Sequence, residues 1–363
     1  MPRERIIDFL PEIYGAFLPA FFERPMAEER HATCASCAMC APADAPLPAE
    51  AYFSPSTKCC TYHPALPNYS VGGLLQDDRP EAAEGRRRIL LKIEARRGVT
   101  PLGILPPART MLLRSHGAQA FGRAVSLACP YLDQERGACT VWAHREAECA
   151  TWFCKHNQAF DGRAFWRQLR DYLQGVHVVL ATYVLRELGF DPDRIAEGFG
   201  TTPDALDARD LDDRPPSDAQ YAAIWGNWTG REQELFVTAY EMVRALDRAR
   251  FAALVGVRHD VTVDRLAKRH DAIYRPQLPD PLVRNPLMRV DRTPDGGYVL
   301  TVGDRGEPTR LRREVYALLD RFDGRQPTAD IRAAIRRDTG LGVSDSFLTA
   351  LHHHRILIGT EGV

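Results

Sequence analysis

The placement of cysteine constrains this chain more than any other sequence feature. All nine cysteines lie between residues 34 and 154, in two groups with ligand-like spacing. The first group is Cys34, Cys37, Cys40, Cys59 and Cys60, and the second is Cys129, Cys139, Cys149 and Cys154. Two residues between successive cysteines let a tight turn direct both sulfurs toward one ion or cluster. We therefore expect all nine to be metal ligands, with buried apolar cysteines as the alternative.

The rest of the sequence favours a cytoplasmic location. Asp8, Pro11 and Pro19 interrupt the apolar stretches of the first 25 residues, which therefore lack the apolar core of a signal peptide. The longest apolar stretch, at 176–185, is too short to span a bilayer. Cytoplasmic thiols stay reduced, so we expect a metal rather than disulfides. A disulfide-stapled secreted protein is the alternative.

Length and charge limit the classes of partner. The chain has 363 residues, enough for two or three domains, and its composition is that of a globular protein, 45% hydrophobic and 26% charged. Its formal net charge is −1, which argues against nucleic acid or an anionic membrane as a partner. We expect no membrane partner.

The chain predicts a mainly α fold whose N-terminal region is irregular and stapled by metal. A cysteine-cluster domain is expected over 1–160, a helical domain over 161–275 and a small α+β domain over 285–363. Before the second cysteine group, 80–97 predicts a helix that buries Ile89, Leu90 and Ile93. After that group, apolar residues at helical spacing predict a long helix over 162–189. These residues are Phe165, Leu169, Tyr172, Leu173, Val176, Leu180, Tyr183, Val184 and Leu188.

Two further features punctuate the middle of the chain. Ser217 and Gln220 have the spacing of a capping box at the start of a helix. Residues 232–254 predict one more helix with an apolar stripe. A proline-rich boundary at 276–286 then separates the C-terminal unit.

The C-terminal unit has the pattern of a winged helix. Residues 288–292 and 298–302 alternate with period two around Asp295-Gly296-Gly297, which predicts a β-hairpin. Helices are expected at 311–322, 328–338 and 344–354, and a last strand at 356–358. The run His352-His353-His354 is expected to be an exposed helix end, because consecutive helical residues point in different directions and chelate poorly.

The cysteines are compatible with two kinds of metal centre. Structural zinc takes four thiolates for each ion, so eight cysteines could hold two ions. An iron–sulfur cluster also takes four, leaving others for a second centre. The spacing Cys34-x-x-Cys37-x-x-Cys40 resembles the first ligands of a ferredoxin-type site, and Pro130 after Cys129 fits the same pattern.

Other side chains near the cysteines are weaker candidates. Any of His31, His63, His144 and His156 could ligate a metal or orient a ligand, although ordinary packing is the stronger expectation for each. Trp142, Trp152, Phe153 and Trp166 flank the second group and are expected to form an apolar shell around the metal. No catalytic residue and no further cofactor-binding residue can be assigned.

The second cysteine group resembles the YkgJ-type cysteine-cluster family of zinc- or iron-chelating domains. The resemblance covers about residues 30–160 and rests on Cys129-Pro-Tyr-Leu-Asp, Cys139-Thr-Val-Trp and Arg145-Glu-Ala-Glu-Cys149-Ala-Thr-Trp-Phe-Cys154. Glu146 stands where the family usually has proline, and Ala150 where it usually has arginine. The resemblance implies a metal centre that joins two distant segments. Flagellin lysine N-methylases resemble this family, and this likeness implies an iron–sulfur centre that is used together with S-adenosylmethionine. The glycines at 72–73 and 198–200 are too few for a dinucleotide or methyl-donor loop.

The C-terminal unit resembles PqqD-type winged-helix modules. Residues 315–324 and 327–331 carry this resemblance, which implies binding of a protein or peptide substrate along a strand edge. A DNA-binding winged helix is the alternative, but nine arginines against seven acidic residues over 309–363 leave a net charge too small for a duplex-binding face. A unit that only packs against the rest of the chain is the third interpretation.

Three functional classes follow from these features. The first is a metal-binding protein whose zinc or iron–sulfur centre is structural or redox-active. The second is an enzyme that modifies a protein or peptide, for example an iron–sulfur, S-adenosylmethionine-dependent lysine methylase. The third is a metal- or redox-responsive regulator.

Overall fold

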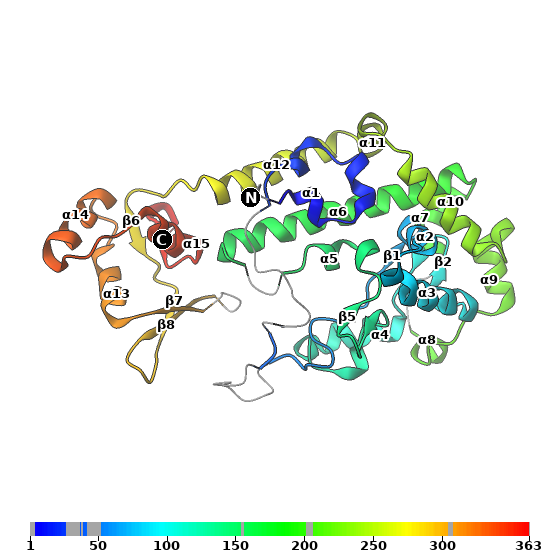
Figure 1. Cartoon of the computed structure of the whole chain (residues 1–363), viewed down its shortest axis with the longest axis horizontal. Helices are drawn as coiled ribbons and strands as arrows, with labels where there is room; N and C mark the ends of the chain where they lie inside the picture. Colours follow the sequence, from blue (N-terminus) through cyan, green and yellow to red (C-terminus); the bar gives the residue numbers. More distant parts are fainter. Residues whose placement is uncertain are drawn as a thin grey trace. The chain divides into compact units, whose positions relative to one another are not determined.

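The structure is a computed structural model that describes residues 4–26, 37, 39–41, 52–153, 156–200, 206–303 and 308–362 (Figure 1). Its residues divide into two compact units. The N-terminal unit contains the described residues of 4–153 and 169–263, and the C-terminal unit contains the described residues of 156–168 and 264–362. Most of the described elements are helices, and the sheets are small, so the predicted mainly α class is confirmed.

The N-terminal unit begins with short helices and two small sheets. Its helices before residue 153 are α1 (Ile6–Phe9), η1 (Glu12–Ala16), η2 (Ala20–Glu23), α2 (Asn68–Gln76), η5 (Pro80–Ala82), α3 (Ala83–Ala95), α4 (Ala108–His116), η6 (Ala118–Ala120), η7 (Val125–Leu127), η8 (Trp142–His144) and α5 (Ala147–Ala150). One sheet has the order β1 (Leu66–Pro67), β3 (Gly103–Ile104), β2 (Val99–Thr100), and the other pairs β4 (Leu132–Asp133) with β5 (Ala138–Cys139).

The described residues between 159 and 274 are mostly helical. Its elements are α6 (Ala159–Glu187), α7 (Pro192–Ala196), η9 (Gly198–Gly200), α8 (Ala208–Leu211), α9 (Asp218–Trp225), η10 (Gly226–Trp228), α10 (Glu232–Arg244), α11 (Arg248–Val255) and α12 (Val257–Tyr274). In the described part of the chain, no helix is both long and apolar enough to cross a membrane.

Several local predictions for these helices are confirmed. Helix α6 (Ala159–Glu187) begins three residues before the predicted range 162–189 and ends two residues before the end of that range, and seven of the nine predicted apolar positions are buried: Phe165, Leu169, Tyr172, Leu173, Val176, Leu180 and Val184. The capping box of α9 is present, with Ser217 Oγ accepting from Gln220 N at 3.3 Å and Gln220 Oε1 accepting from Ser217 N at 3.0 Å.

Two local predictions need correction. The single helix predicted over 232–254 is broken between α10 and α11, because Asp247 caps a new helix by accepting from Arg250 N at 2.8 Å. In α3, Ile89 and Ile93 are buried as predicted, but Leu90 is 36% exposed. Leu90 directly follows Ile89, so its side chain leaves the buried stripe of the helix by about 100°.

A glycine pair in α2 determines how the core of the N-terminal unit packs. Gly72 and Gly73 lie against α10, and a Cβ added at Gly72 would overlap the carbonyl oxygen of Phe236 and lie 2.9 Å from Tyr240 Cβ. The two helix backbones therefore approach closely because these residues lack side chains. The close packing of α2 on α10 is therefore a structural reason for Gly72 and Gly73, which do not have the pattern of a phosphate-binding loop.

The C-terminal unit has its own sheets and helices. Its elements after α12 are β6 (Leu282–Arg284), β7 (Met288–Arg292), β8 (Tyr298–Val302), β9 (Thr309–Leu311), α13 (Arg313–Leu318), η11 (Leu319–Arg321), α14 (Thr328–Thr339), α15 (Asp345–His353), β10 (Leu357–Gly359) and η12 (Thr360–Gly362). The predicted hairpin is confirmed, with Met288 opposite Val302 and Arg292 opposite Tyr298. Strand β9 adds to β8, while β10 pairs with β6 instead of joining the hairpin sheet.

The histidine run near the C-terminus is not an exposed helix end. His353 is buried and its Nδ1 lies 2.7 Å from Asp161 Oδ2, while His354 Nδ1 lies 2.7 Å from Thr309 Oγ1. Arg355 Nη2 also donates to Asp161, at 2.7 Å. The three histidines have separate partners, since His352 Nδ1 lies 3.1 Å from Leu357 O, and all three contacts lie within the C-terminal unit.

Candidate metal centre

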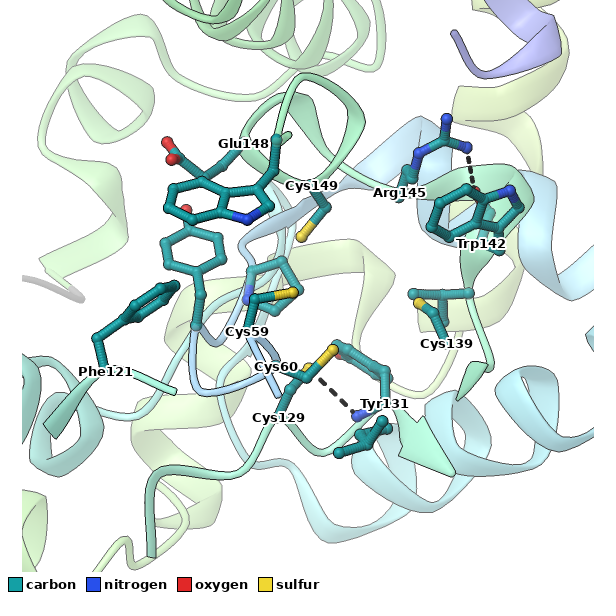
Figure 2. Close-up of a pocket in the computed structure, with 15 residues that line it drawn as sticks. Cys59, Cys60, Phe121, Cys129, Tyr131, Cys139, Trp142, Arg145, Glu148 and Cys149 are labelled. Atoms are coloured by element: carbon teal, nitrogen blue, oxygen red, sulfur yellow. Dashed lines mark hydrogen bonds between the residues drawn. The ribbon is translucent and has the colours of Figure 1, made fainter. Parts of the chain in front are cut away.

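Five cysteines line one cavity of ≈ 110 Å³ in the N-terminal unit (Figure 2). They are Cys59, Cys60, Cys129, Cys139 and Cys149, so both sequence groups contribute. Figure 2 shows the five side chains arranged around the same space, with their sulfur atoms on its inner side. The other lining residues are Tyr62, Pro64, Phe121, Tyr131, Leu132, Val141, Trp142, Arg145, Glu148 and Trp152.

A direct backbone hydrogen bond joins the two cysteine groups. Cys129 N donates to Cys60 O at 2.7 Å. The loop that carries Cys59 and Cys60 is also fixed to Gly122, whose carbonyl accepts from Thr57 Oγ1 at 3.0 Å and whose N–H donates to Thr61 Oγ1 at 2.7 Å. Specific hydrogen bonds, more than helices or strands, therefore hold this loop in position.

The β4–β5 hairpin places Cys139 near Cys129. Leu132 lies opposite Cys139 in this ladder, and the Asp133 carboxylate accepts from the backbone N–H of Glu135 and of Arg136 in the turn. Behind the hairpin, a Cβ added at Gly85 of α3 would overlap the carbonyl oxygen of Thr140. Helix α3 thus supports the strand beside Cys139 through a close backbone contact.

Helix α5 presents Cys149 to the cavity. Its N-cap is Glu146, whose carboxylate accepts from Glu148 N at 2.9 Å and from Cys149 N at 3.0 Å. This capping gives Glu146 a local structural role at the position where the YkgJ-type pattern has proline. Burial raises the pKa of Glu146 to about 7. Ala150, where that pattern has arginine, is buried.

Burial and two nearby lysines act on the thiols that line the cavity. Burial raises the pKa of Cys129 and of Cys149, whereas a hydrogen bond with Cys59 lowers the pKa of Cys60. Lys58 also lowers the pKa of Cys60, and Lys92 acts in the same direction on Cys129. The two lysines thus favour the thiolate, which is the metal-binding form of cysteine, whereas burial favours the protonated thiol of Cys129 and Cys149.

The hydrogen bond from Tyr131 N to Cys129 Sγ, at 3.5 Å, is of the type that orients and stabilises a thiolate ligand (Figure 2). The residue that donates it, Tyr131, is buried and lines the cavity. Cys129 is therefore held by two backbone hydrogen bonds, one to its sulfur and one from its own N–H to Cys60 O.

The described histidines near the cysteines lie outside the cavity. His144 Nε2 is 2.9 Å from Asp77 Oδ2, and Asp77 also accepts from Arg79 at 2.8 Å. The Arg79 guanidinium, and next the His144 hydrogen bond, hold the pKa of Asp77 well below its usual range. His63 is buried with its ring edge-on to Tyr131, and burial lowers its pKa to about 3. His63, His144 and His156 do not line the cavity, and His31 lies outside the described residues.

The remaining predicted ligands are not brought to this cavity by the described part of the chain. Cys37 and Cys40 form a separate pair, with Cys40 N donating to Cys37 O at 3.1 Å. Burial and the neighbouring Cys37 raise the pKa of Cys40 to about 11. Cys34 and Cys154 lie outside the described residues. Among the residues with described positions, no three Cys, His, Asp or Glu side chains are grouped so as to hold one metal ion.

The aromatic surroundings differ from those expected. Trp142 and Trp152 line the cavity as predicted, whereas Phe153 stacks on Phe9 with ring centroids 5.2 Å apart and is not a lining residue. Trp166 is not a lining residue either. Sequence reasoning missed Tyr62 and Phe121, because nothing in their local sequence shows that these loops meet. Arg145 and Glu148 belong to the sequence motif around Cys149, and that motif could have identified them as residues of the site.

Comparisons of the chain with protein-family models, with curated proteins and with solved structures found no match. The resemblances to YkgJ-type and PqqD-type proteins therefore stay predictions. The case for a metal centre depends on the residues of this chain alone.

Proposed function

We propose that the N-terminal unit is a metal-binding module whose cavity holds an iron–sulfur cluster through cysteine thiolates. The observation that carries this proposal is the convergence of five cysteines, from four separate places in the chain, on one cavity. Thiolates are soft ligands that select iron–sulfur clusters, zinc or copper(I) over hard cations. Such a centre needs several thiolates close together, and the loops of this unit bring cysteines from distant segments to one cavity.

The size of the cavity favours a cluster over a single ion. Its volume is ≈ 110 Å³, whereas about 15 Å³ is enough for a single water molecule. The thiols surround a space instead of meeting at a point, which suits a polynuclear centre. Zinc is the second candidate, because a set of thiolates also suits zinc.

Four thiolates from the set Cys59, Cys60, Cys129, Cys139 and Cys149 would hold the cluster. When bound, such a cluster supplies one-electron redox chemistry, with a potential set by its charge, hydrogen bonds and exposure. The chain contributes the Tyr131 N–H to Cys129 Sγ and walls of Val141, Leu132 and aromatic residues that limit the access of water.

Modification of a protein or peptide is a second candidate function, with S-adenosylmethionine as the further cofactor. The observation that favours it is the sheet β7–β8–β9, in which β7 and β9 are the outer strands. An outer strand offers backbone groups to which an extended peptide can add. We propose this edge as the docking site of such a substrate. A test is titration with candidate peptides, followed by amide exchange at β7 and β9.

Replacement of a lining cysteine tests the metal-binding function directly. We expect Cys139→Ala and Cys149→Ala to lower the bound metal by about tenfold or more, since loss of even an outer-shell partner costs 10–100-fold in affinity. The measurement is metal per protein after purification without oxygen. Val141→Ala is the matched control, because Val141 is buried in the same wall and has no ligand atom. Equal metal loss in the control, or full metal content in both cysteine variants, would contradict the proposal.

A further inference from the structure

Arg145 is a buried cation on the wall of the cavity. It is 6% exposed and lines the same space as Cys139 and Cys149 (Figure 2). Its Nη1 donates to Trp142 O at 2.7 Å and its Nη2 to Phe9 O at 2.6 Å. The guanidinium also lies over the Trp142 ring, 4.1 Å from the centroid. These contacts fix its position, but all of these acceptors are neutral.

The acidic residues nearest in sequence have other partners. Glu146 caps α5, and Glu148 pairs with Arg170 at 3.3 Å. Within the part of the chain that the structure describes, Arg145 has no carboxylate in ion-pair contact, and its buried Nε has no hydrogen-bond partner. Burial lowers the pKa of Arg145, and the neighbouring Cys139 and Cys149 sulfurs, followed by Tyr14, act in the opposite direction.

A buried guanidinium without an anion is energetically unfavourable. Removing an ion from water costs several kcal/mol in a protein, and a buried cation is accordingly expected to be paired with an opposite charge. We infer that Arg145 is the counter-charge of the thiolate-ligated centre in this cavity. The inference rests on the proposed metal-binding function.

This role has a consequence for the redox and binding properties of the centre. A thiolate-ligated cluster becomes more negative when it is reduced, so a fixed cation in a water-poor site stabilises the reduced form and raises the midpoint potential. The same attraction favours retention of zinc by thiolates. Arg145 would act through charge on the centre, as a positioning and tuning residue, without being a ligand.

The experiment compares Arg145→Met, Arg145→Lys and the control Arg114→Met in full-length protein. Arg114 is exposed and lies over the ring of Tyr62, another lining residue, at 4.9 Å. Solvent screens its charge, so its removal should change little. Metal content and thermal unfolding are measured first, followed by spectroelectrochemical titration. For a zinc-loaded protein, chelator competition replaces the titration.

We expect Arg145→Met to shift the ratio of reduced to oxidised cluster about tenfold toward oxidised at a fixed potential, a lowering of about 59 mV for a one-electron centre. In the zinc case we expect about tenfold weaker retention. Arg145→Lys should keep most of the wild-type value, and Arg114→Met should keep all of it.

Two results would overturn the inference alone. One is a metal-loaded Arg145→Met protein with wild-type potential and retention. The other is an equal loss in Arg145→Lys and Arg145→Met together with equal loss of thermal stability, which would make the role of Arg145 purely structural. A wild-type protein that binds neither iron nor zinc would instead overturn the proposed function, and the inference with it, before any variant is compared.

Discussion

Removal of the metal is expected to unfold the cysteine-bearing loops of the N-terminal unit and to leave the C-terminal unit folded. The regular elements next to the lining cysteines are short: β4 and β5 have two residues each and α5 has four. Structural sites of this kind contribute on the order of 10 kcal/mol to folding, which is comparable to the whole stability of a typical domain. The C-terminal unit has its own core, which includes Leu300, Ile335 and Leu348.

Amide hydrogen exchange measured by mass spectrometry, before and after metal removal under reducing conditions, is the suitable measurement. Peptides that cover 52–64 and 121–153 should lose most of their protection, and peptides from α14 and α15 should keep theirs. Circular dichroism should show only a partial loss of helix, because α6 and α10 lie outside the loops. Unchanged protection of the cysteine loops in metal-free protein would contradict this expectation.

The second large effect is expected from Gly72→Ala. The new methyl group would overlap the carbonyl oxygen of Phe236 in α10, and backbone atoms on both sides cannot move without separating the two helices. Overpacking typically costs about 1–3 kcal/mol and occasionally more, and the overlap with backbone atoms places this substitution at the upper end of that range. Leu235 and Phe236 of α10 are fully buried in the same core as Val71 and Leu74, so the change should destabilise the N-terminal unit as a whole.

Gly175→Ala is the matched control for this substitution. Gly175 lies inside α6 with no atom within 4 Å of an added Cβ. Alanine there should therefore stabilise the helix by up to about 1 kcal/mol. Urea unfolding followed by tryptophan fluorescence gives both changes in the free energy of unfolding. Equal effects of the two substitutions would show that the close approach of α2 and α10 is wrong.

Local signals carried the correct parts of the sequence prediction. The stripe of α6, the capping box of α9 and the β7–β8 hairpin each depend on residues close together in the chain, where periodicity and turn chemistry act. The break after Arg244 was missed because apolar spacing continues through it, and only the cap at Asp247 marks the new helix. The pairing of β10 with β6 joins distant segments, which no local pattern reveals.

The same limit applies to the candidate site. Spacing identified the cysteines, but it could not show that Cys59, Cys60, Cys129, Cys139 and Cys149 share a cavity while Cys37 and Cys40 pair elsewhere. That division depends on the hydrogen bond from Cys129 N to Cys60 O and on the loop contacts at Gly122, which arise only in the folded chain. The burial of Arg145 likewise depends on Phe9, far away in sequence.

The composition of the centre tests the central claim most directly. Protein purified without oxygen should be analysed for iron, zinc and acid-labile sulfide, alongside its absorption spectrum. The account predicts iron and sulfide in matching amounts and a broad band near roughly 400 nm, as expected for thiolate-ligated clusters. Zinc in a colourless protein would instead support the second candidate, a zinc centre. Wild-type protein without iron, zinc or sulfide, and with all lining cysteines reactive as free thiols, would contradict the account.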